Sequence, residues 1–115
     1  MAFAIEASPA GRAVVLAVNG DVDIATAPAL RERLADAVTA YDRVVVDLDA
    51  VPFLDSTGLG VLVAAHNRAK VAGSTLVVAR PQRIVRNALR LVQVDTVIDV
   101  FDTLDAALDG AAGTA

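Results

Sequence analysis

The sequence predicts an α/β fold with a mixed central β-sheet of four to five strands and about four α-helices. Short apolar runs rich in β-branched residues alternate with longer segments in which apolar residues recur every three or four positions. The first two short runs are separated only by a connector containing Pro and Gly, which is typical of an antiparallel hairpin. The later runs are separated by helical segments, and strands joined through helices run parallel by right-handed crossovers.

The opening hairpin is predicted from one strand at residues 2–7 and a second at residues 12–19. The connector is Ser8-Pro9-Ala10-Gly11, whose Pro and Gly suit a turn. Residues 20–24 then lead out of the second strand toward the first helix. Because the two strands are adjacent in the chain, we expect them to pair at one side of the sheet.

The first helix is predicted from a cap and a continuous apolar face. Thr26 can cap the helix, and Pro28 occupies its first turn, where a missing N–H costs nothing. Apolar residues keep helical spacing at positions 27, 30, 34, 37, 38 and 41. Charged residues take the other side, so we expect this helix to lie with one face on the sheet.

The middle of the chain holds a strand that reads as fully buried. Residues 43–48 include three consecutive valines, and β-branched side chains suit a pleat that is covered on at least one face. The connection at residues 49–54 contains Pro52, which forbids a continued helix and makes an interior ladder position improbable. A second helix is therefore predicted to begin only after this connection.

The start of the second helix is the most informative part of the sequence. Asp55 is a good N-cap, so Ser56 and Thr57 are expected in the first turn, with the Ser56 hydroxyl exposed beyond the end of a strand. Gly58 and Gly60 remove side chains from the same region at a cost of roughly 1 kcal/mol each relative to alanine. Either tight packing on the sheet or a bare contact surface would explain the two glycines, and the spacing favours neither.

The second helix is predicted to end at Ala72, with Gly73 as a left-handed cap, and a strand follows at residues 75–79. Pro81 can open a third helix. Its predicted inner face consists of Ile84, Val85, Ala88, Leu89, Leu91 and Val92. Its outer face is expected to be solvated and carries Arg83, Arg86 and Arg90.

The C-terminal part is predicted to add one short strand and one helix. Residues 97–101 suit a final strand, and residues 102–105 resemble a capping box that starts a helix running through Leu108. We expect one domain at residues 1–110 and a flexible tail at residues 111–115.

Composition limits the classes of function that need to be considered. A 115-residue chain with 56% hydrophobic residues fits one ordered domain, and a net charge of -4 disfavours nucleic acid as a partner. No apolar run approaches the roughly 18 residues that a membrane span needs. The N-terminus lacks the basic region of a signal peptide, so we expect a cytoplasmic protein that does not engage a membrane.

The residues do not assemble an enzyme site, so we expect no enzymatic activity, no cofactor and no metal. The sequence has no cysteine and a single histidine, His66, which is predicted to pack partly buried. His66 follows Ser56 by ten residues on one helix, about 15 Å away, so it cannot activate that serine. The glycine-rich turn lacks the Lys-Ser or Lys-Thr of a phosphate-binding loop. The sequence also contains two pairs of aspartates with two-residue spacing, which we interpret as caps and turn residues and not as an acidic cluster: Asp21 and Asp23, and Asp47 and Asp49.

A phosphate on a serine in the first turn of a helix would be electrostatically favoured, which indicates a switch without an enzyme. Three segments support this interpretation: Gly20–Asp23, Val44–Leu54 and, above all, Asp55-Ser56-Thr57-Gly58-Leu59-Gly60-Val61-Leu62. Together they resemble the STAS-domain anti-sigma factor antagonists of bacteria. The resemblance spans nearly the whole chain and implies a STAS-type fold.

In that family, the serine directly after the aspartate is phosphorylated by an anti-sigma factor that is also a serine kinase. The unphosphorylated antagonist binds the kinase and frees a sigma factor, and a PP2C-type phosphatase reverses the modification. The resemblance therefore implies a phosphoprotein that regulates transcription by partner switching in a stress response, with Ser56 as the phosphoacceptor. It implies partner-binding or supporting roles for Asp23, Thr26, Asp55, Thr57, Gly58 and Leu59. Many members have a second serine where this chain has Thr57, which leaves a second hydroxyl at the site.

Two other classes of function remain open from the sequence. STAS domains also serve as non-enzymatic subunits of lipid-transport complexes, which would need no phosphorylation. A phosphotransfer receiver is suggested by Val45-Val46-Asp47-Leu48 ahead of a proline, but receivers need a lysine beside the aspartate, and Lys70 lies late in a helix. The oligomeric state stays open between a monomer and a weak dimer.

Overall fold

The computed structural model describes residues 2–113, with side chains through residue 110. In this part of the chain the strands are β1 (Ala4–Ala10), β2 (Ala13–Asn19), β3 (Arg43–Ala50), β4 (Thr75–Ala79) and β5 (Val100–Phe101). The helices are α1 (Ala27–Ala40), α2 (Ser56–Ala72), α3 (Arg83–Leu91) and α4 (Leu104–Gly113), with a 3-10 turn η1 at Val94–Thr96.

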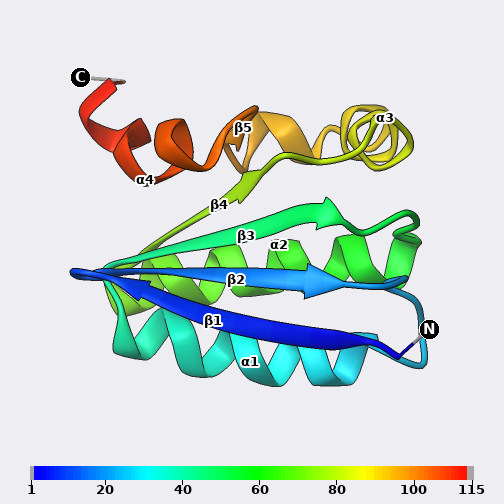
Figure 1. Ribbon diagram of the computed structural model, residues 1–115, viewed down its shortest axis with the longest axis horizontal. Coiled ribbons are helices and arrows are strands. Elements are labelled where there is room, and N and C mark those ends of the chain that lie inside the picture. Colours follow the sequence, from blue (N-terminus) through cyan, green and yellow to red (C-terminus); the bar gives the residue numbers. More distant parts are fainter. Residues whose placement is uncertain (1, 114–115) are drawn as a thin grey trace.

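The described strands form one sheet in the order β1-β2-β3-β4-β5. β1 pairs with β2 antiparallel, and the other neighbours pair parallel, as right-handed crossovers through helices require. Figure 1 shows α1 and α2 together on one side of the sheet, with α4 on the other side. The predicted mixed α/β sheet is therefore confirmed.

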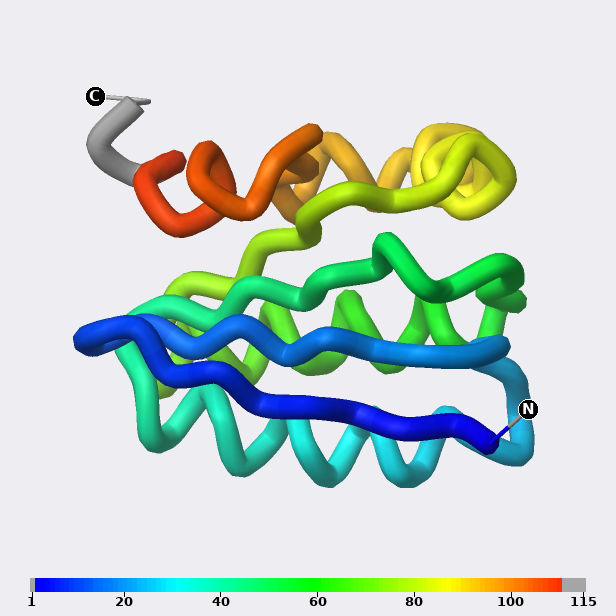
Figure 2. The backbone as a smooth tube through the Cα atoms, in the orientation of Figure 1, coloured from blue at the N-terminus to red at the C-terminus, as the bar shows by residue number. Residues whose placement is uncertain are grey.

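The core lies on both faces of β3. Val44, Val46 and Leu48 pack with α1 and α2 in the larger apolar cluster. Val45 points the other way and packs with Ala107 of α4 in the smaller one. Burial on both faces explains why β3 reads as a continuous apolar run in place of an alternating one. The tube in Figure 2 follows β3 into the connection that leads to α2, where the candidate site begins.

The first strand is longer than the sequence predicts. β1 runs through Ser8 and Pro9 to Ala10, and Ala10 pairs with Ala13, so the turn shortens to Gly11 and Arg12. The predicted connector at residues 8–11 was therefore wrong. Pro9 is tolerated because β1 is an edge strand, where a missing N–H breaks no ladder bond with a further strand. Gly11 supplies the left-handed backbone of the turn, with φ +64°.

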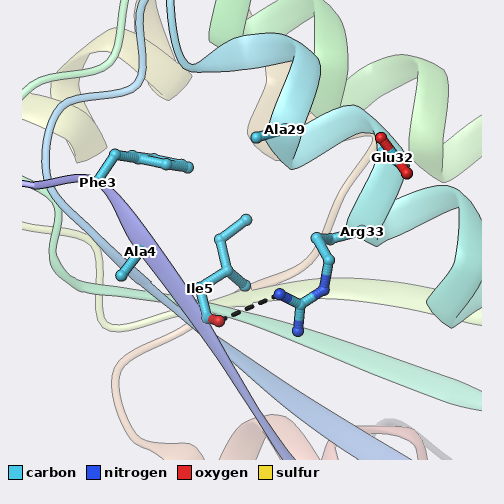
Figure 3. A pocket seen from close by; sticks show the side chains of 6 residues that line it. All are labelled: Phe3, Ala4, Ile5, Ala29, Glu32 and Arg33. Atoms are coloured by element: carbon cyan, nitrogen blue, oxygen red, sulfur yellow. Dashed lines mark hydrogen bonds between the residues drawn. The ribbon is translucent and has the colours of Figure 1, made fainter.

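The outer edge of β1 is partly closed by a side chain from α1. Arg33 donates a hydrogen bond from Nη1 to the carbonyl oxygen of Ile5 over 3.2 Å, and Phe3 and Ile5 lie between β1 and α1 (Figure 3). This bond occupies the carbonyl oxygen of Ile5, a backbone acceptor that a further strand could otherwise use. Pro9 has no backbone N–H, so it offers no donor at the same edge. Both features disfavour edge-to-edge pairing of β1 with a second sheet.

The inner face predicted for α3 was only partly right. Val85 and Leu89 are buried, but Ile84, Leu91 and Val92 are 66%, 84% and 55% exposed. A helix of nine residues buries one narrow stripe, and Val85 and Leu89 form it by lying one turn apart. The chain then leaves the helix at Gln93, whose φ of 60° turns it into η1, an element that the sequence did not predict. Leu91 and Val92 consequently point to solvent.

The C-terminal elements occur in the predicted order with shifted bounds. The final strand covers only Val100–Phe101 of the predicted residues 97–101. Oγ1 of Thr103 accepts the N–H of Ala106 over 3.0 Å, so Thr103 caps α4, and the helix continues past Leu108 to Gly113. The domain boundary at residue 110 and the flexible tail of residues 111–115 stay predictions, and residues 114–115 of that tail lie outside the described part of the chain.

Candidate functional site

The site is built around the N-terminus of α2. Asp55 has an extended backbone, and its Oδ1 accepts hydrogen bonds from the N–H of Thr57 over 2.9 Å and of Gly58 over 3.1 Å. The carbonyl oxygen of Asp55 accepts the N–H of Leu59 over 3.0 Å. The predicted N-cap is confirmed, and it places Ser56 as the first residue of the helix, exposed to solvent.

The loop after β2 lies directly against the loop before α2. Val22 forms an isolated parallel bridge with Leu54. The N–H of Val22 donates to the carbonyl oxygen of Phe53 over 2.9 Å, and the N–H of Asp55 donates to that of Val22 over 3.1 Å. Two segments that lie about 30 residues apart in the chain are thus joined by backbone hydrogen bonds, so that Asp23 lies beside the start of α2.

Asp23 and Thr26 hold the first of these loops in shape. Oδ1 of Asp23 accepts the N–H groups of Ala25 and Thr26 over 2.9 and 3.1 Å. Oγ1 of Thr26 accepts the N–H of Asp23 over 3.0 Å and donates to the carbonyl oxygen of Asp21 over 2.8 Å. Thr26 stands at the N-cap position, but its hydroxyl makes no cap hydrogen bond to α1. Its predicted capping role was therefore wrong, because the hydroxyl is committed to the loop before it.

The two glycines of α2 have different surroundings. A Cβ on Gly58 would lie 2.7 Å from Cγ1 of Val22 and 3.0 Å from Cγ of Leu54, whereas a Cβ on Gly60 would meet nothing within 4 Å. Gly58 is therefore a packing glycine and Gly60 a surface one, which resolves the alternatives that the sequence left open. Leu59 is only 9% exposed and belongs to the core.

Two exposed apolar side chains beside the site were not predicted. Ile24, in the loop braced by Asp23, is 77% exposed, and Phe53, in the loop before Asp55, is 46% exposed. The sequence offered a weak signal only for Phe53, a large apolar residue in an irregular loop directly after Pro52. Both loops meet at the Val22–Leu54 bridge, so the two side chains flank the start of α2. Single exposed apolar residues are common on protein surfaces, but two at one loop junction favour a contact surface.

A groove opens on the other side of Ser56. It has a volume of about 530 Å³ and is lined by Ser56, Leu59, Gly60, Val63, Ala64, Asn67, Val92 and Val94. Its walls come from α2 and from the segment that joins α3 to η1. The sequence reasoning missed it because it depends on the exposure of Val92, which was predicted to be buried.

Asp47 does not share an acidic cluster with the loop aspartates. It is only 5% exposed and makes two hydrogen bonds with Arg80, Nη2 to Oδ2 over 2.7 Å and Nε to Oδ1 over 3.1 Å. The hydrogen bond that Arg80 donates to the Asp47 carboxylate raises the pKa of Arg80 above its usual value. The sequence predicted Asp47 to be a cap or turn residue, but it lies inside β3 and forms a structural ion pair. The bidentate geometry of this pair is the one that a guanidinium favours.

The described residues show neither a metal-binding group nor a membrane span. Residues 2–113 include no group of three or more His, Cys, Asp or Glu side chains placed to hold a metal ion. None of the helices in this range is both long enough and apolar enough to cross a bilayer.

Comparison with known proteins finds one family over nearly all of the chain. The model of the STAS domain matches residues 4–107. The anti-sigma-F factor antagonist RsfB of Mycobacterium tuberculosis is 36% identical over 100 residues, which cover 86% of this chain and 81% of RsfB.

Solved structures agree with this result. The crystal structure of an anti-sigma factor antagonist from Mycobacterium paratuberculosis superposes with a TM-score of 0.87 at 28% identity. The match covers 95% of this chain and 93% of the Mycobacterium paratuberculosis chain. The Bacillus cell fate determinant SpoIIAA, solved in its phosphorylated form, shares the fold with a TM-score of 0.71 at 18% identity, covering 96% of this chain and 99% of its own.

Proposed function

This chain belongs to the STAS domain family, and from that membership we propose that it is an anti-sigma factor antagonist switched by phosphorylation of Ser56. Its similarity to RsfB, which is named an anti-sigma-F factor antagonist, supports the first part of the proposal. The exposed position of Ser56 as the first residue of α2, directly after the capping Asp55, supports the second part.

The proposed cycle has two states. Unphosphorylated, the protein binds an anti-sigma factor that is also a serine kinase, and the sigma factor held by that kinase is released. The kinase transfers phosphate to Ser56 and the complex separates, and a PP2C-type phosphatase restores the first state. The protein acts in the cytoplasm as a transcription regulator in a stress response and has no catalytic activity of its own.

The geometry supports a mechanism of direct blockade. The N–H groups of Thr57, Gly58 and Leu59 already bond to Asp55, so a phosphate on Ser56 would gain few new hydrogen bonds from the helix. The dianion would instead stay at the surface beside the Asp55 carboxylate. In a partner interface shaped for a neutral hydroxyl, that charge must lose water without a compensating partner, which costs several kcal/mol.

The residues implied by the family resemblance divide into two groups. Ser56 and the partly exposed Asp55 and Thr57 lie where a partner could touch them. Asp23, Thr26, Gly58 and Leu59 act mainly by support, because they brace the loop or pack beneath it. We add Ile24 and Phe53 to the contact surface because both are exposed apolar side chains in the two loops that meet at the Val22–Leu54 bridge.

Phosphorylation in vitro tests this function. The purified protein is incubated with ATP and each serine-kinase anti-sigma factor of its own organism, and the modified residue is located by mass spectrometry. Phosphate should appear on Ser56, should vanish in Ser56→Ala and should persist in Thr57→Ala. If every such kinase leaves the protein unmodified, or if the phosphate resides elsewhere, the proposed function is wrong.

A further inference from the structure

Helix α3 exposes two neighbouring rows of side chains. Opposite its buried residues lie Arg83, Asn87 and Arg90, which recur at helical spacing and are all exposed. Beside them lie Ile84 and Leu91, which are seven residues apart and are 66% and 84% exposed. Neither Arg83 nor Arg90 belongs to an ion pair among the side chains of residues 2–110. The outer side of α3 is therefore a basic row next to an apolar one, without a partner in the described part of the chain.

The sign of the charge reverses directly after α3. Residues 91–110 contain five acidic residues and no basic one. The acidic residues are Asp95, Asp99, Asp102, Asp105 and Asp109. From elsewhere in the chain, Arg86 pairs with Asp102, and Arg43 lies within electrostatic reach of Asp99 and Asp109. Two arginines cannot offset five carboxylates, so this segment keeps an excess of negative charge.

Helix α4 presents part of this acidic segment on its outer side. It packs on the sheet through Leu104 and Ala107, so Asp105, Ala106 and Asp109 share its opposite, exposed side. Figure 1 shows α3 and α4 at opposite ends of one side of the molecule. A two-fold rotation about an axis between them would place each α3 on the α4 of another copy, so that one contact forms twice.

We propose that the protein forms a symmetric dimer in which α3 of each copy packs against α4 of the other, with Arg83 and Arg90 facing Asp105 and Asp109. The two arginines lie about 10 Å apart along their helix and the two carboxylates about 6 Å apart along theirs, a difference that long arginine side chains can bridge. The inference does not rest on the proposed function, because neither phosphate nor an anti-sigma factor takes part in this contact.

The acidic surroundings of α3 favour a second copy over a bilayer. Asp95 and Asp99 line a hollow together with Arg86 of α3, and Asp102 pairs with the same arginine. An anionic bilayer is flat and extended, so it would meet these carboxylates as well as the outer arginines and would be repelled by them. A single helix of a second copy needs to touch only the outer side of α3.

The dimer should be weak because its interface is small. Helix α3 has nine residues and α4 has ten, so each contact between them is about 15 Å long. Two such contacts bury less than the roughly 1,600 Å² of a standard interface, which places the dimer in the weak class. Because opposite charges meet in both contacts, added salt should weaken the association.

A charge swap followed by sedimentation equilibrium tests the dimer. The wild type should dimerise at protein concentrations of about 0.1 to 1 mM. The variants Arg83→Glu/Arg90→Glu and Asp105→Lys/Asp109→Lys should each raise the dissociation constant about tenfold or more, because like charges then meet in both contacts. Mixed in equal amounts, the two variants should form a heterodimer about as readily as the wild type. In that mixture each α3 meets an α4 of opposite charge.

Controls on other helices show that the effect belongs to these surfaces. Arg31→Glu and Glu32→Lys reverse exposed charges on α1 and should leave the dissociation constant within about twofold. Leu91→Ser should weaken the dimer, whereas Val71→Ser, which alters a comparably exposed apolar residue of α2, should not. Melting curves verify that each variant is folded, and Asp105→Lys alone replaces the double lysine variant if that variant unfolds.

The outcomes are distinct. A wild type that stays monomeric at about 1 mM, or two folded charge variants that do not associate when mixed, overturns the inference. A monomeric wild type that sediments with phosphatidylglycerol vesicles, and loses this binding in Arg83→Glu/Arg90→Glu, also overturns it and assigns α3 to a membrane surface.

Discussion

Gly58 lies so close to Val22 that a Cβ at position 58 would come within 2.7 Å of Cγ1 of Val22. Val22 itself is completely buried and is hydrogen-bonded through its backbone to Phe53 and Asp55. The first turn of α2 therefore rests on the loop that follows β2. The exposed position of Ser56 is a consequence of this contact, because it fixes the start of the helix against the sheet.

The contact predicts opposite effects for the two glycines of α2. Gly58→Ala should lower the free energy of unfolding by about 1 to 2 kcal/mol, because a stiff, buried Val22 must move to admit the methyl group. Gly60→Ala should instead raise it by about 0.5 to 1 kcal/mol through better helix propensity in open space. Thermal or urea unfolding of both variants decides this, and equal effects would show that Gly58 is not a packing glycine.

A second prediction concerns the ion pair between Asp47 and Arg80. Arg80→Ala should destabilise the fold by about 2 to 3 kcal/mol, since it leaves a buried carboxylate without its partner. The exposed Arg83, three residues later at the start of α3, is the matched control and should change stability by less than about 0.5 kcal/mol when replaced by Ala. Urea denaturation measures both, and a loss below about 1 kcal/mol for Arg80→Ala would mean that water or another group compensates Asp47.

Much of the fold could be predicted because local signals and tertiary packing agree. The valine run of β3, the cap at Asp55 and the left-handed Gly73 each specify their element directly. The errors occur where an edge or an exposed face decides the outcome. Pro9 continues a strand because that strand lies at the sheet edge, and Leu91 is exposed because α3 ends where the chain must turn toward η1.

In the candidate site, too, local features could be predicted from the sequence, whereas features that depend on tertiary packing could not. Ser56 could be placed from its position after a cap residue, which is a local feature. Ile24 and the groove wall at Val92 could not be placed, because their exposure depends on how the loops and α3 pack against the rest of the chain. The resemblance to the family implied partner-binding or supporting roles for Asp23 and Thr26, and these roles stay predictions. Their hydrogen bonds to the loop backbone come from the structure alone.

Two substitutions of Ser56 should distinguish the effect of losing its hydroxyl from the effect of adding a negative charge. Ser56→Ala removes one hydroxyl and leaves the rest of the surface intact, so this variant should bind the anti-sigma factor without being released by ATP. Ser56→Glu should bind poorly, because a carboxylate must be desolvated in the interface. Calorimetry with the same anti-sigma factor measures both affinities. Equal affinities of the two variants would contradict a role for charge at Ser56.

The central claim is that phosphorylation of Ser56 blocks partner binding without unfolding the domain. The stability of the fold and the affinity for the partner should therefore respond differently to the phosphate. A phosphate on Ser56 gains about 0.3 to 1 kcal/mol from the dipole of α2. Repulsion from the neighbouring Asp55 costs a comparable amount at this exposed position. The free energy of unfolding should therefore change by less than about 1 kcal/mol, a melting shift of no more than roughly 4 to 8 °C.

The most direct test compares phosphorylated and unphosphorylated protein in one set of samples, by melting curves, amide hydrogen exchange and titration with the anti-sigma factor. Blockade predicts an affinity loss of about a hundredfold or more, with exchange protection unchanged outside the first turn of α2. Loss of protection across the sheet, or a fall in melting temperature beyond about 10 °C, would show that phosphorylation acts by unfolding the domain.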